Sequence, residues 1–555
     1  MTYMQQSKES YDVMPASYQK GRAKYIIISG SVISGVGKGT FSSCLGTLLK
    51  LYHGLNVAPI KFDGYLNVDA GTLNPYRHGE VFVLEDGAET DLDLGSYERM
   101  LNQNLTKDNY LTAGKLFKMI IDKERAGDFL GRDVQFIPHV TGEIKGFLRN
   151  LAVKSNADIV LVEVGGTVGD IENSYFLEAM RELAYEEGKE NVCFVNVAYI
   201  IEPKSLGEHK SKAAQLGIRT LMQLGIQPDI VVCRSRNPVP ENIKEKMSVF
   251  SNVPVKRVVN AYDFGTIYSI PVFLKENEVD KEILDILKIN TDKNSGQFKK
   301  WEQLVEKINS AKREITVAIT GKYTGVHDSY LSILKALEHT APYYGVKINI
   351  KWIDTTEIKN QEDAEKNLKE VQGIVVPGGF GERGVEGKIE CIRFTREKNV
   401  PFFGLCYGMQ LAAIEFSRNV CELTDAHTTE VKPNTENPVI KILPEQEEVR
   451  GLGGTMRLGA YDIVIKSGTL AAGLYGKLKV KERFRHRYNV NPKYIDIIEQ
   501  KGLVFSGSAP EKKIMQILEL PGHKFFVGTQ FHPEFTSKPL EPNPLFRGFV
   551  EACVK

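Results

Sequence analysis

The cysteine best suited to covalent chemistry in this chain lies between two glycines. Cys406 follows an apolar run in PFFGLCYG and precedes a second apolar run, MQLAAIEF, with helical spacing. Gly404 and Gly408 let the backbone turn sharply and let a strand and a helix pack closely, which is the geometry of a nucleophile elbow with Cys in place of Ser. Backbone dipoles at the start of the following helix stabilise a thiolate. The pattern predicts that Cys406 is a catalytic nucleophile.

A nucleophilic cysteine needs a base and a group that orients the base. The segment FVGTQFHPEF supplies His532 and, two residues later, Glu534. In extended structure these side chains point to the same side, so the carboxylate can hold the imidazole. The glycines of VVPGGFGERG can expose backbone N–H groups as an oxyanion hole. Each segment alone is typical of a structural thiol or a turn, but the three together, each after an apolar strand, favour catalysis.

A glycine-rich turn near the N-terminus is suited to binding phosphates. In YIIISGSVISGVGKGTF an apolar run leads into the turn, where successive backbone N–H groups can cradle phosphates beside Lys38. The turn is not a Walker A motif, because Val32 stands where Gly is required and Gly39 stands where Ser or Thr is required. A tight turn at the start of a helix is the alternative interpretation.

Two acidic segments carry candidate metal ligands. HGEVFVLEDGAETDLDLGSYER contains Asp93, and LVEVGGTVGDIE contains Glu163 at the end of an apolar run. Hard carboxylate oxygens from two segments suit Mg²⁺ that bridges nucleotide phosphates, so Asp93 and Glu163 are the best ligand candidates. An acidic run on its own is more typical of a solvated loop.

Four further lysines could neutralise phosphate charge, namely Lys61, Lys210, Lys212 and Lys246. Any one of them alone is typical of a solvated surface. Together with Lys38 they could neutralise two triphosphates.

Buried strands must position these residues. KYIIISG, ADIVLVEVGG, VCFVNVAYI and PDIVVCRS predict parallel strands, and the pattern restarts with ITVAITGKY, VKINIKWID, GIVVPGGFG and PFFGLCYG. Ligands bind outside the carboxyl ends of such strands. The fold class is therefore α/β, with two doubly wound domains. We predict a flexible extension at 1–24, an N-terminal domain at 25–289, a linker with one amphipathic helix at 290–313 and a C-terminal domain at 314–555.

The composition excludes several classes of protein. A chain of 555 residues is too long for one hydrophobic core. The net charge of +1 gives no sign of a segment that binds nucleic acid or a membrane surface. The seven cysteines are scattered without CxxC spacing, and no run has the pattern of a signal peptide or a membrane span. We expect a cytoplasmic protein that binds neither nucleic acid nor membrane.

The C-terminal segments resemble the class I, or triad, glutamine amidotransferases over about residues 313–555. The resemblance implies that Cys406 attacks the glutamine amide, with His532 as base and Glu534 as its orienting partner. This attack would form a glutamyl thioester and release ammonia. The residues that the resemblance assigns to the oxyanion and glutamine sites are Gly379, Tyr407 through its backbone N–H, Gln410, Glu430 and Arg487.

The chain as a whole resembles the CTP synthases. Matching segments run in one order from Tyr25 to Phe549: SGVGKG, NVDAGT, HGEVFVLEDGAETDLDLG, VGGTVGDIE, GIQPDIVVCRS, GGFGERGVEGK, GGTMRLGAYD and QFHPEFTSKP. The resemblance implies a P-loop-like, dethiobiotin-synthetase-like amidoligase domain in front of the glutaminase. Such a ligase uses ATP and Mg²⁺ to phosphorylate O4 of UTP, then replaces that phosphate with ammonia from glutamine to give CTP. GTP would activate glutamine hydrolysis, with Lys322 as a candidate contact, and the subunits would form homotetramers and filaments.

The resemblance also assigns nucleotide-binding roles. The phosphate loop would comprise Ser34, Gly35, Val36, Gly37, Lys38, Gly39 and Thr40. Lys38 and Lys61 would stabilise the transferring phosphate, while Asp93 and Glu163 would hold Mg²⁺. The remaining assignments are Arg234 and Asp263 for ATP, Lys210, Lys212, Gln215 and Lys246 for the uridine triphosphate, and Asp170, Ile171 and Glu172 for CTP as an inhibitor.

This chain departs from the family near the nucleotide sites. Ala213 and Ala214 replace a Pro and a hydroxyl residue of the uridine-site motif, and Gly64 replaces the usual Pro in KxDPY. We expect a more flexible uridine-site loop, and we hypothesise lower affinity for UTP or acceptance of a modified uridine nucleotide. Two other interpretations are an amidoligase with another acceptor, as in the cobyrinic-acid amidases, and a regulatory or filament-forming paralogue without catalysis.

Overall fold

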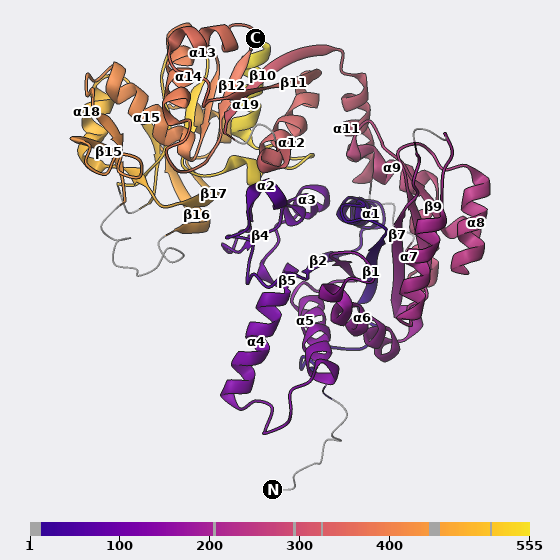
Figure 1. Cartoon of the computed structure of the whole chain (residues 1–555). Coiled ribbons are helices and arrows are strands. Elements are labelled where there is room, and N and C mark those ends of the chain that lie inside the picture. Colours follow the sequence, from indigo (N-terminus) through magenta and orange to yellow (C-terminus); the bar gives the residue numbers. More distant parts are fainter. Residues whose placement is uncertain are drawn as a thin grey trace. The chain divides into compact units, whose positions relative to one another are not determined.

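A computed structural model describes residues 11, 13–203, 207–291, 296–322, 326–442, 456–510 and 513–555. The chain divides into two compact units (Figure 1). The first comprises Met1–Thr72 and Ser96–Glu302, and the second comprises Leu73–Gly95 and Gln303–Lys555. We call Leu73–Gly95 the acidic segment. It packs with the C-terminal half of the chain, whereas the predicted domain boundaries include it in the N-terminal domain.

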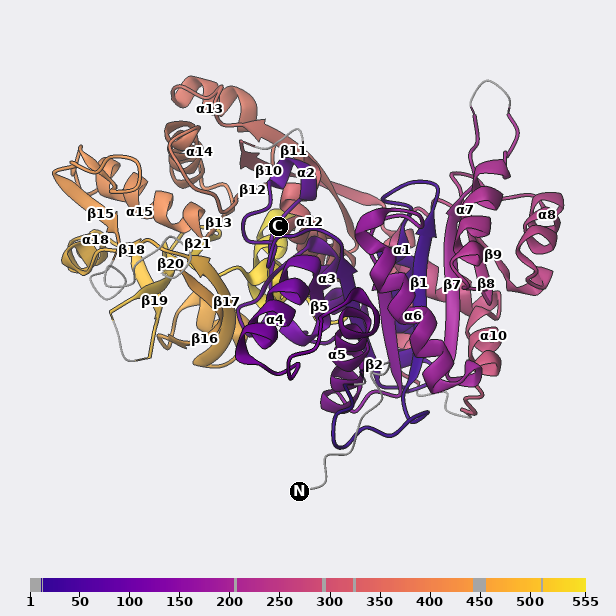
Figure 2. The ribbon, with the colours of Figure 1, turned by 60° about the horizontal axis from the view of Figure 1, so that its bottom comes forward.

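The first unit is built on a parallel sheet whose strand order is β5-β2-β6-β1-β7-β8-β9. Its strands are β1 (Lys24–Ser31), β2 (Val57–Asp63), β5 (Tyr110–Thr112), β6 (Ile159–Val164), β7 (Val192–Tyr199), β8 (Ile230–Arg234) and β9 (Val258–Ala261). Figure 2 shows β1, β7, β8 and β9 side by side. The four strands predicted from apolar runs in this half are confirmed.

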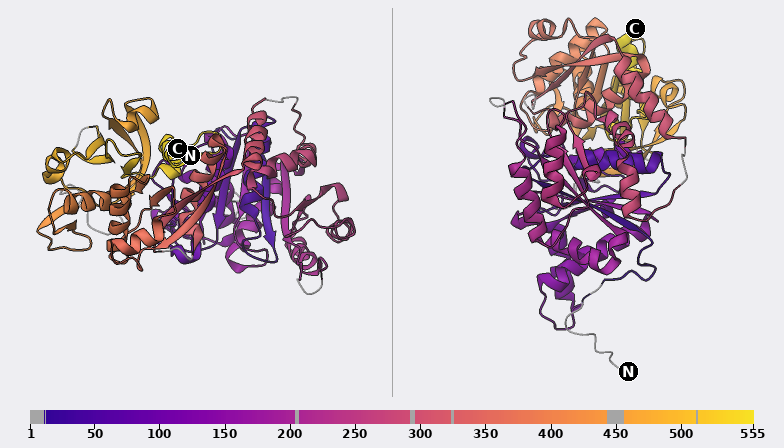
Figure 3. Two further views of the ribbon diagram at one scale, coloured as in Figure 1. Left: turned by 90° about the horizontal axis from the view of Figure 1, so that it is seen from above. Right: turned by 90° about the vertical axis from the view of Figure 1, so that its right-hand side faces the viewer.

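Helices cover both faces of this sheet, because successive side chains of a strand point to opposite faces. Val160 and Val162 of β6 join a core with α5 and α6, whereas Leu161 faces Gly46 of α1. Figures 1 and 3 show this layering. The helices are α1 (Lys38–Leu51), α4 (Ala113–Ala126), α5 (Thr141–Lys154), α6 (Ser174–Glu187), α7 (Lys212–Gln223), α8 (Glu241–Ser251), α9 (Ile270–Glu276) and α10 (Val279–Ile286), with α3 (Leu92–Leu101) and α11 (Phe298–Ser310) running into the second unit.

The second unit is built on a mixed sheet in the order β11-β10-β12-β13-β21-β20-β19-β16-β17. The part from β11 to β21 is parallel, as predicted, while the part from β20 to β17 is antiparallel and was not predicted. Its strands are β10 (Arg313–Gly321), β11 (Val346–Asp354), β12 (Gly373–Val376), β13 (Phe402–Leu405), β16 (Arg457–Ile465), β17 (Lys479–His486), β19 (Val504–Ser508), β20 (Met515–Glu519) and β21 (Phe526–Thr529). Smaller sheets contain β3 (Phe82–Val83) with β4 (Glu89–Thr90), and β14 (Ala426–Thr428), β15 (Asn437–Lys441) and β18 (Asn489–Val490).

Helices again cover both faces of the parallel part. Phe402 and Phe526 join a core with α14 and α15, whereas Phe403 and Val527 join the opposite core with α12 and α19. The helices are α2 (Pro75–His78), α12 (Leu331–Thr340), α13 (Gln361–Leu368), α14 (Val385–Lys398), α15 (Tyr407–Asn419), α17 (Leu470–Tyr475), α18 (Ile495–Gln500) and α19 (Pro544–Val554).

Part of the segment predicted as a flexible extension is packed against the first unit. Tyr11 contacts the rings of Phe129 and His139, and its hydroxyl donates to Glu143 at 2.6 Å. This part of the predicted extension therefore lies against α5, because its aromatic residues offset its polar composition. The amphipathic helix predicted in the linker is α11, and its Trp301 is fully buried. Residues 1–10, 12 and 292–295 lie outside the described part of the chain.

Candidate active site

Cys406 lies at the sharp turn between β13 and α15. It is the residue before the first helical position, with φ at +51° and ψ at −99°, a strained conformation for a residue other than glycine. A Cβ on Gly408 would lie 2.2 Å from the Val376 carbonyl oxygen, and one on Gly404 would lie 2.9 Å from the Gly408 carbonyl oxygen. The two glycines are therefore required for strand and helix to approach, and the turn has the elbow geometry that the sequence predicted.

His532 and Glu534 are in contact, as their spacing suggested, but the backbone conformation that brings them together differs from the predicted one. His532 Nδ1 lies 2.7 Å from Glu534 Oε1, and the exposed fractions of Cys406, His532 and Glu534 are 6%, 8% and 4%. The residues after His532 form a 3-10 turn, Pro533–Phe535, rather than extended structure. The predicted reason for the pairing was therefore wrong, since Pro533 opens a tight turn and the turn itself brings the carboxylate back to the ring.

Electrostatics favours the protonated form of this histidine. Burial opposes protonation, but the negative charges of Glu534 and of an ionised Cys406 outweigh burial and raise the pKa of His532 to about 10. An imidazolium next to a cysteine favours its thiolate. The pair is thus suited to nucleophilic attack followed by proton return to a leaving group.

The sulfur of Cys406 is also held by residues that the sequence analysis did not assign. Gln530 Nε2 donates to Sγ at 3.6 Å, and the thiol donates to the Arg485 carbonyl oxygen at 3.6 Å. The Cys406 N–H donates to the Thr529 carbonyl oxygen at 2.6 Å. Gln530 could have been found from its position in GTQFHPEF, because a buried amide at the end of an apolar strand needs partners.

The loop after β12 passes directly beside the reacting pair. A Cβ on Gly378 would lie 3.2 Å from His532 Cε1 and 3.6 Å from Cys406 Cβ. A Cβ on Gly379, the predicted oxyanion residue, would lie 4.0 Å from Tyr407 Cδ1. Gly378, which the sequence analysis did not single out, is thus the nearer of the two glycines to the nucleophile.

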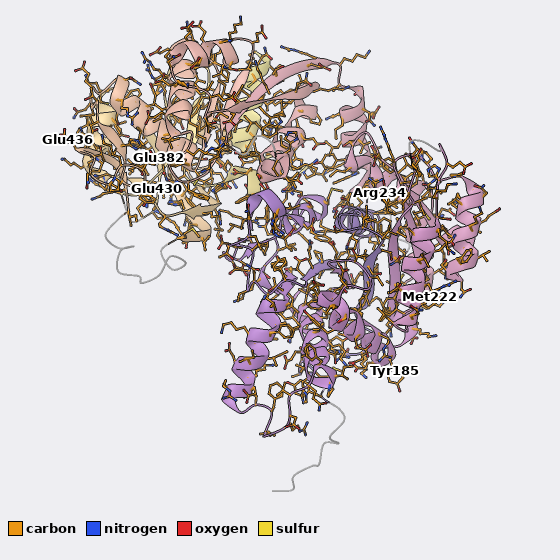
Figure 4. All side chains as sticks on the ribbon, viewed as in Figure 1. Tyr185, Met222, Arg234, Glu382, Glu430 and Glu436 are labelled. Atoms are coloured by element: carbon orange, nitrogen blue, oxygen red, sulfur yellow. The ribbon has the colours of Figure 1, made fainter. Side chains whose placement is uncertain are left out.

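Of the residues assigned to glutamine, Glu430 and Tyr407 contact this loop, whereas Gln410 contacts Tyr488 and Gln530. The Gly381 N–H donates to Glu430 Oε1 at 2.9 Å, and the Tyr407 hydroxyl donates to the Gly381 carbonyl oxygen at 3.4 Å (Figure 4 labels Glu430). Gln410 Nε2 donates to the Tyr488 carbonyl oxygen at 2.9 Å and to Gln530 at 3.1 Å. Arg487 lies between β17 and β18, in the same loop as Tyr488.

The acidic segment packs against other residues of its own unit rather than forming a solvated loop. Glu80 accepts the Ser332 N–H at 2.9 Å, and Glu89 accepts Arg485 Nε at 2.7 Å. The ring of Phe82 stands edge-on to Phe535, with centroids 5.0 Å apart, and Phe535 stacks on the His532 ring at 4.9 Å. The segment that contains Asp93 therefore also packs, through Phe82 and Phe535, towards the ring of His532.

In the first unit, the phosphate-loop residues connect β1 to α1. Gly35 and Gly37 have φ of +70° and +92°, and Lys38, Gly39 and Thr40 form the first turn of α1. Lys38 is buried, and its Nζ donates to the Gly166 carbonyl oxygen at 2.6 Å. The loop therefore has the backbone geometry of an anion-binding turn at a helix start.

Further charged residues of the first unit gather at the carboxyl ends of its strands. Arg234 at the end of β8 (Figure 4) forms an ion pair with Asp263, and its Nε would lie 3.6 Å from a Cβ on Gly37. In β2, Lys61 is buried with its Nζ 3.7 Å from Asp63. The two predicted ATP contacts are thus neighbours, and Arg234 lies beside the phosphate loop.

Glu163 is a buried carboxylate at the end of β6, with the Tyr97 hydroxyl 2.8 Å from its Oε2. The Tyr97 hydroxyl also lies 2.7 Å from Ser42 Oγ in α1. Asp93 lies in the first turn of α3, where its N–H donates to Asp91 at 3.0 Å. Within the described ranges, no three His, Cys, Asp or Glu side chains form a metal cage. A buried carboxylate still fits Mg²⁺, which binds one or two carboxylates together with phosphates and water.

Of the predicted uridine-triphosphate residues, Lys212, Gln215 and Lys246 lie in helices, and Lys210 lies just before α7. Ala213 and Ala214 belong to the first turn of α7, and Ala214 is fully buried. The two positions therefore belong to a helix rather than to the predicted loop, while the predicted increase in flexibility stays a prediction. Lys210 pairs with Glu208 at 2.6 Å, and Gln215 Nε2 donates to Ser211 Oγ at 3.0 Å. Lys212 begins α7, and Lys246 lies on α8, which packs against α7.

The segment assigned to CTP recognition lies close to Gly64. Asp170 accepts the Thr167 N–H at 2.7 Å, and Ile171 and Glu172 open a 3-10 turn. A Cβ on Gly64 would lie 2.7 Å from Glu172 Cβ and 2.9 Å from the Glu172 carbonyl oxygen. The departure at Gly64 thus permits a close approach that a side chain would prevent.

Two family models match successive parts of the chain. Residues 325–552 match the family model described as glutamine amidotransferase class-I, and residues 24–289 match the model described as CTP synthase N-terminus. The C-terminal fold is that of a class I glutamine amidotransferase. A CTP synthase from Caldanaerobacter subterraneus is 48% identical over 96% of this chain and 98% of its own length. One from Thermococcus gammatolerans is 49% identical with the same coverage. The chain therefore belongs to the CTP synthase family.

A solved structure is also similar. The glutaminase domain of a Trypanosoma brucei CTP synthase with bound acivicin is 36% identical, covers 43% of this chain and 94% of that chain, and gives a TM-score of 0.41. Within the described part of the chain, no helix combines the length and apolarity needed to cross a membrane.

Proposed function

We propose that this protein catalyses the ATP-dependent amination of UTP to CTP with ammonia released from glutamine. The observation that carries the proposal is the buried Cys406-His532-Glu534 site on a nucleophile elbow, in a chain whose N-terminal half matches the CTP synthase model. The test is to incubate the protein with UTP, ATP and Mg²⁺ and either glutamine or ammonium, and to measure CTP. CTP formation with either nitrogen source supports the proposal, and its absence with both contradicts it.

In the glutaminase step, the Cys406 thiolate attacks the amide carbon of glutamine, and the C=O electron pair moves onto oxygen. The C–N bond then breaks, and the nitrogen leaves as ammonia with a proton from His532. The product is a glutamyl thioester, which water hydrolyses with His532 as base. Glu534 holds the imidazole through Nδ1, which leaves Nε2 for these proton transfers.

The glutamine itself would lie beside the loop of Gly378 and Gly379. The nearby assigned residues are Tyr407, Gln410, Glu430 and Arg487. Glu430 and the Tyr407 hydroxyl both bond the Gly381 backbone, so they fix the loop that follows the two glycines. The Tyr407 N–H, at the first position of α15, is suited to the developing oxyanion.

In the synthase step, a phosphoryl group passes from ATP to O4 of UTP, which turns that oxygen into a leaving group for attack by ammonia. Such a transfer depends on positioning and on neutralisation of charge. The buried Lys38 beside the turn at Gly35 and Gly37 supports this role, as does Arg234 next to the same turn. When bound, Mg²⁺ would neutralise phosphate charge, held by Glu163 and Asp93.

The remaining assignments extend the same proposal. GTP would activate the glutaminase through a site that includes Lys322, and CTP would inhibit through Asp170, Ile171 and Glu172. We also propose a cytoplasmic homotetramer that can form filaments. Light scattering at several nucleotide concentrations measures the oligomeric state, and a strictly monomeric active enzyme would contradict this part.

A further inference from the structure

Lys388 is a buried lysine beneath the loop that borders the catalytic cysteine. It lies in the first turns of α14 with 5% of its surface exposed. Its Nζ donates to the Pro377 carbonyl oxygen at 3.3 Å, and within the described residues it forms no ion pair with a carboxylate. Burial of an amine without a counter-ion destabilises a fold. The position is therefore one where function, rather than stability, explains the residue.

The groups around Lys388 connect it to the active site. Its Nζ lies 5.8 Å from the centre of the Tyr407 ring and would lie 3.7 Å from a Cβ on Gly379. Burial, with a smaller effect of the Lys322 charge, lowers the pKa of Lys388 to about 7, while Cys406 and Cys391 act in the opposite direction. The two carboxylates closest to it in sequence on the same helix have other partners: Glu386 pairs with Arg418 and His427, and Glu390 accepts from Gln361.

The hydrogen bond to Pro377 fixes the direction of the next N–H group. The Pro377 carbonyl and the Gly378 N–H belong to one planar trans peptide, so they point in opposite directions. A donor on the carbonyl therefore orients the N–H, and it also polarises the peptide so that the N–H becomes a stronger donor. Gly378 is the residue whose Cβ would lie 3.6 Å from Cys406 Cβ and 3.2 Å from His532 Cε1.

We propose that Lys388 is a positioning residue for glutamine hydrolysis, which holds the Pro377–Gly378 peptide so that its N–H stabilises the oxyanion formed on the Cys406-bound carbon. This inference rests on the proposed glutaminase function and adds a residue to it. The charge of the ammonium favours the same oxyanion through the peptide, whereas a purely structural lysine would only fix the loop.

The test compares Lys388→Met and Lys388→Arg with Lys398→Met, a matched exposed lysine at the end of the same helix. Glutamate release gives kcat and KM for glutamine between pH 6 and 9. Melting temperature and ammonia-dependent CTP formation on the same preparations report whether each variant is folded.

We expect Lys388→Met to lower kcat for glutamine hydrolysis by about tenfold or more, with little change in KM. The Gly378 N–H remains in this variant but is less firmly oriented, so part of the roughly hundredfold effect of an oxyanion donor is lost. The wild type should show a titration of kcat near pH 7 that Lys388→Met lacks. Lys388→Arg should keep more activity and also lack this titration, because its charge is permanent. Lys398→Met should resemble the wild type.

Two results would overturn the inference. One is a folded Lys388→Met variant with wild-type kcat and pH profile. The other is loss of folding and of ammonia-dependent synthesis in both Lys388 variants, which would define a structural residue. An inactive wild type would instead contradict the proposed glutaminase function.

Discussion

Glu89 and Arg485 are 396 residues apart in sequence, yet the Arg485 Nε donates to Glu89 Oε1 at 2.7 Å. The backbone carbonyl of the same arginine lies 3.6 Å from the Cys406 thiol. The acidic segment therefore contacts Cys406 indirectly. Glu89 binds the side chain of Arg485, and the backbone carbonyl of Arg485 lies beside the Cys406 sulfur.

Glu89→Gln should lower glutamine-dependent turnover several-fold. The substitution removes the negative charge that pairs with Arg485 and weakens the hydrogen bond that holds the Arg485 side chain. A double-mutant cycle with Arg485→Lys should give a coupling energy of about 1 kcal/mol. The control is Glu85→Gln with Lys481→Met, a more exposed pair of the same segment and strand, expected to couple by less than about 0.5 kcal/mol. Equal coupling in both pairs would contradict a special role for Glu89.

Phe535→Leu should reduce kcat for glutamine hydrolysis about threefold to tenfold. Loss of an aromatic pair costs about 0.5–1.5 kcal/mol, which corresponds to a change in rate of this size. Its ring stacks on His532, so the leucine leaves the imidazole less firmly oriented. Phe525→Leu is the control, because Phe525 is equally buried but packs on Phe403 and Phe549. A similar loss of kcat in both variants would point to general loosening of the core.

Gly378→Ala keeps the backbone N–H but should lower glutamine hydrolysis about a hundredfold, because displacement of the loop takes this donor away from the oxyanion. The new Cβ would lie 3.2 Å from His532 Cε1, so either the loop or the imidazole has to move. Gly473→Ala, in α17, meets no atom within 4 Å and should leave activity intact while slightly stabilising the helix. Normal glutaminase activity in Gly378→Ala would show that this loop does not border the reacting carbon.

Lys388→Met should be more stable than the wild type near pH 6, and its advantage should shrink as the pH rises. The pKa of Lys388 is lowered to about 7 in the folded protein, against about 10.4 for a free lysine. Between these values the unfolded chain binds more protons, so wild-type stability rises with pH. Urea unfolding of both proteins at pH 6 and pH 9 measures the difference. A constant difference would indicate that Lys388 does not carry this proton linkage.

The strands that lead into the active site could be predicted from the sequence, because buried parallel strands are continuous apolar runs. β2 was missed, since Pro59, Lys61 and Asp63 interrupt its apolar pattern even though every residue in it is buried. The antiparallel half of the second sheet was missed for a related reason. β17 reads KVKERFRH, where charged residues alternate with apolar ones and give no continuous run.

The candidate catalytic residues Cys406, His532 and Glu534 could be proposed from the sequence because each lies in a short local motif. Their support could not, because it comes from distant segments. Glu89 reads as part of an acidic surface run, and Lys388 in EGKIECIRF reads as the polar side of an amphipathic helix. Only the three-dimensional packing shows that Glu89 binds Arg485 and that Lys388 is buried beside the Pro377 carbonyl.

The central claim is that Cys406 supplies ammonia to a separate ATP-dependent synthase site, and Cys406→Ala tests it most directly. CTP formation from UTP and ATP should be measured for this variant with glutamine and with ammonium as nitrogen source. We predict that glutamine-dependent synthesis is abolished while ammonium-dependent synthesis stays at the wild-type rate. Retained glutamine-dependent synthesis, or loss of both reactions in a folded variant, would contradict the claim.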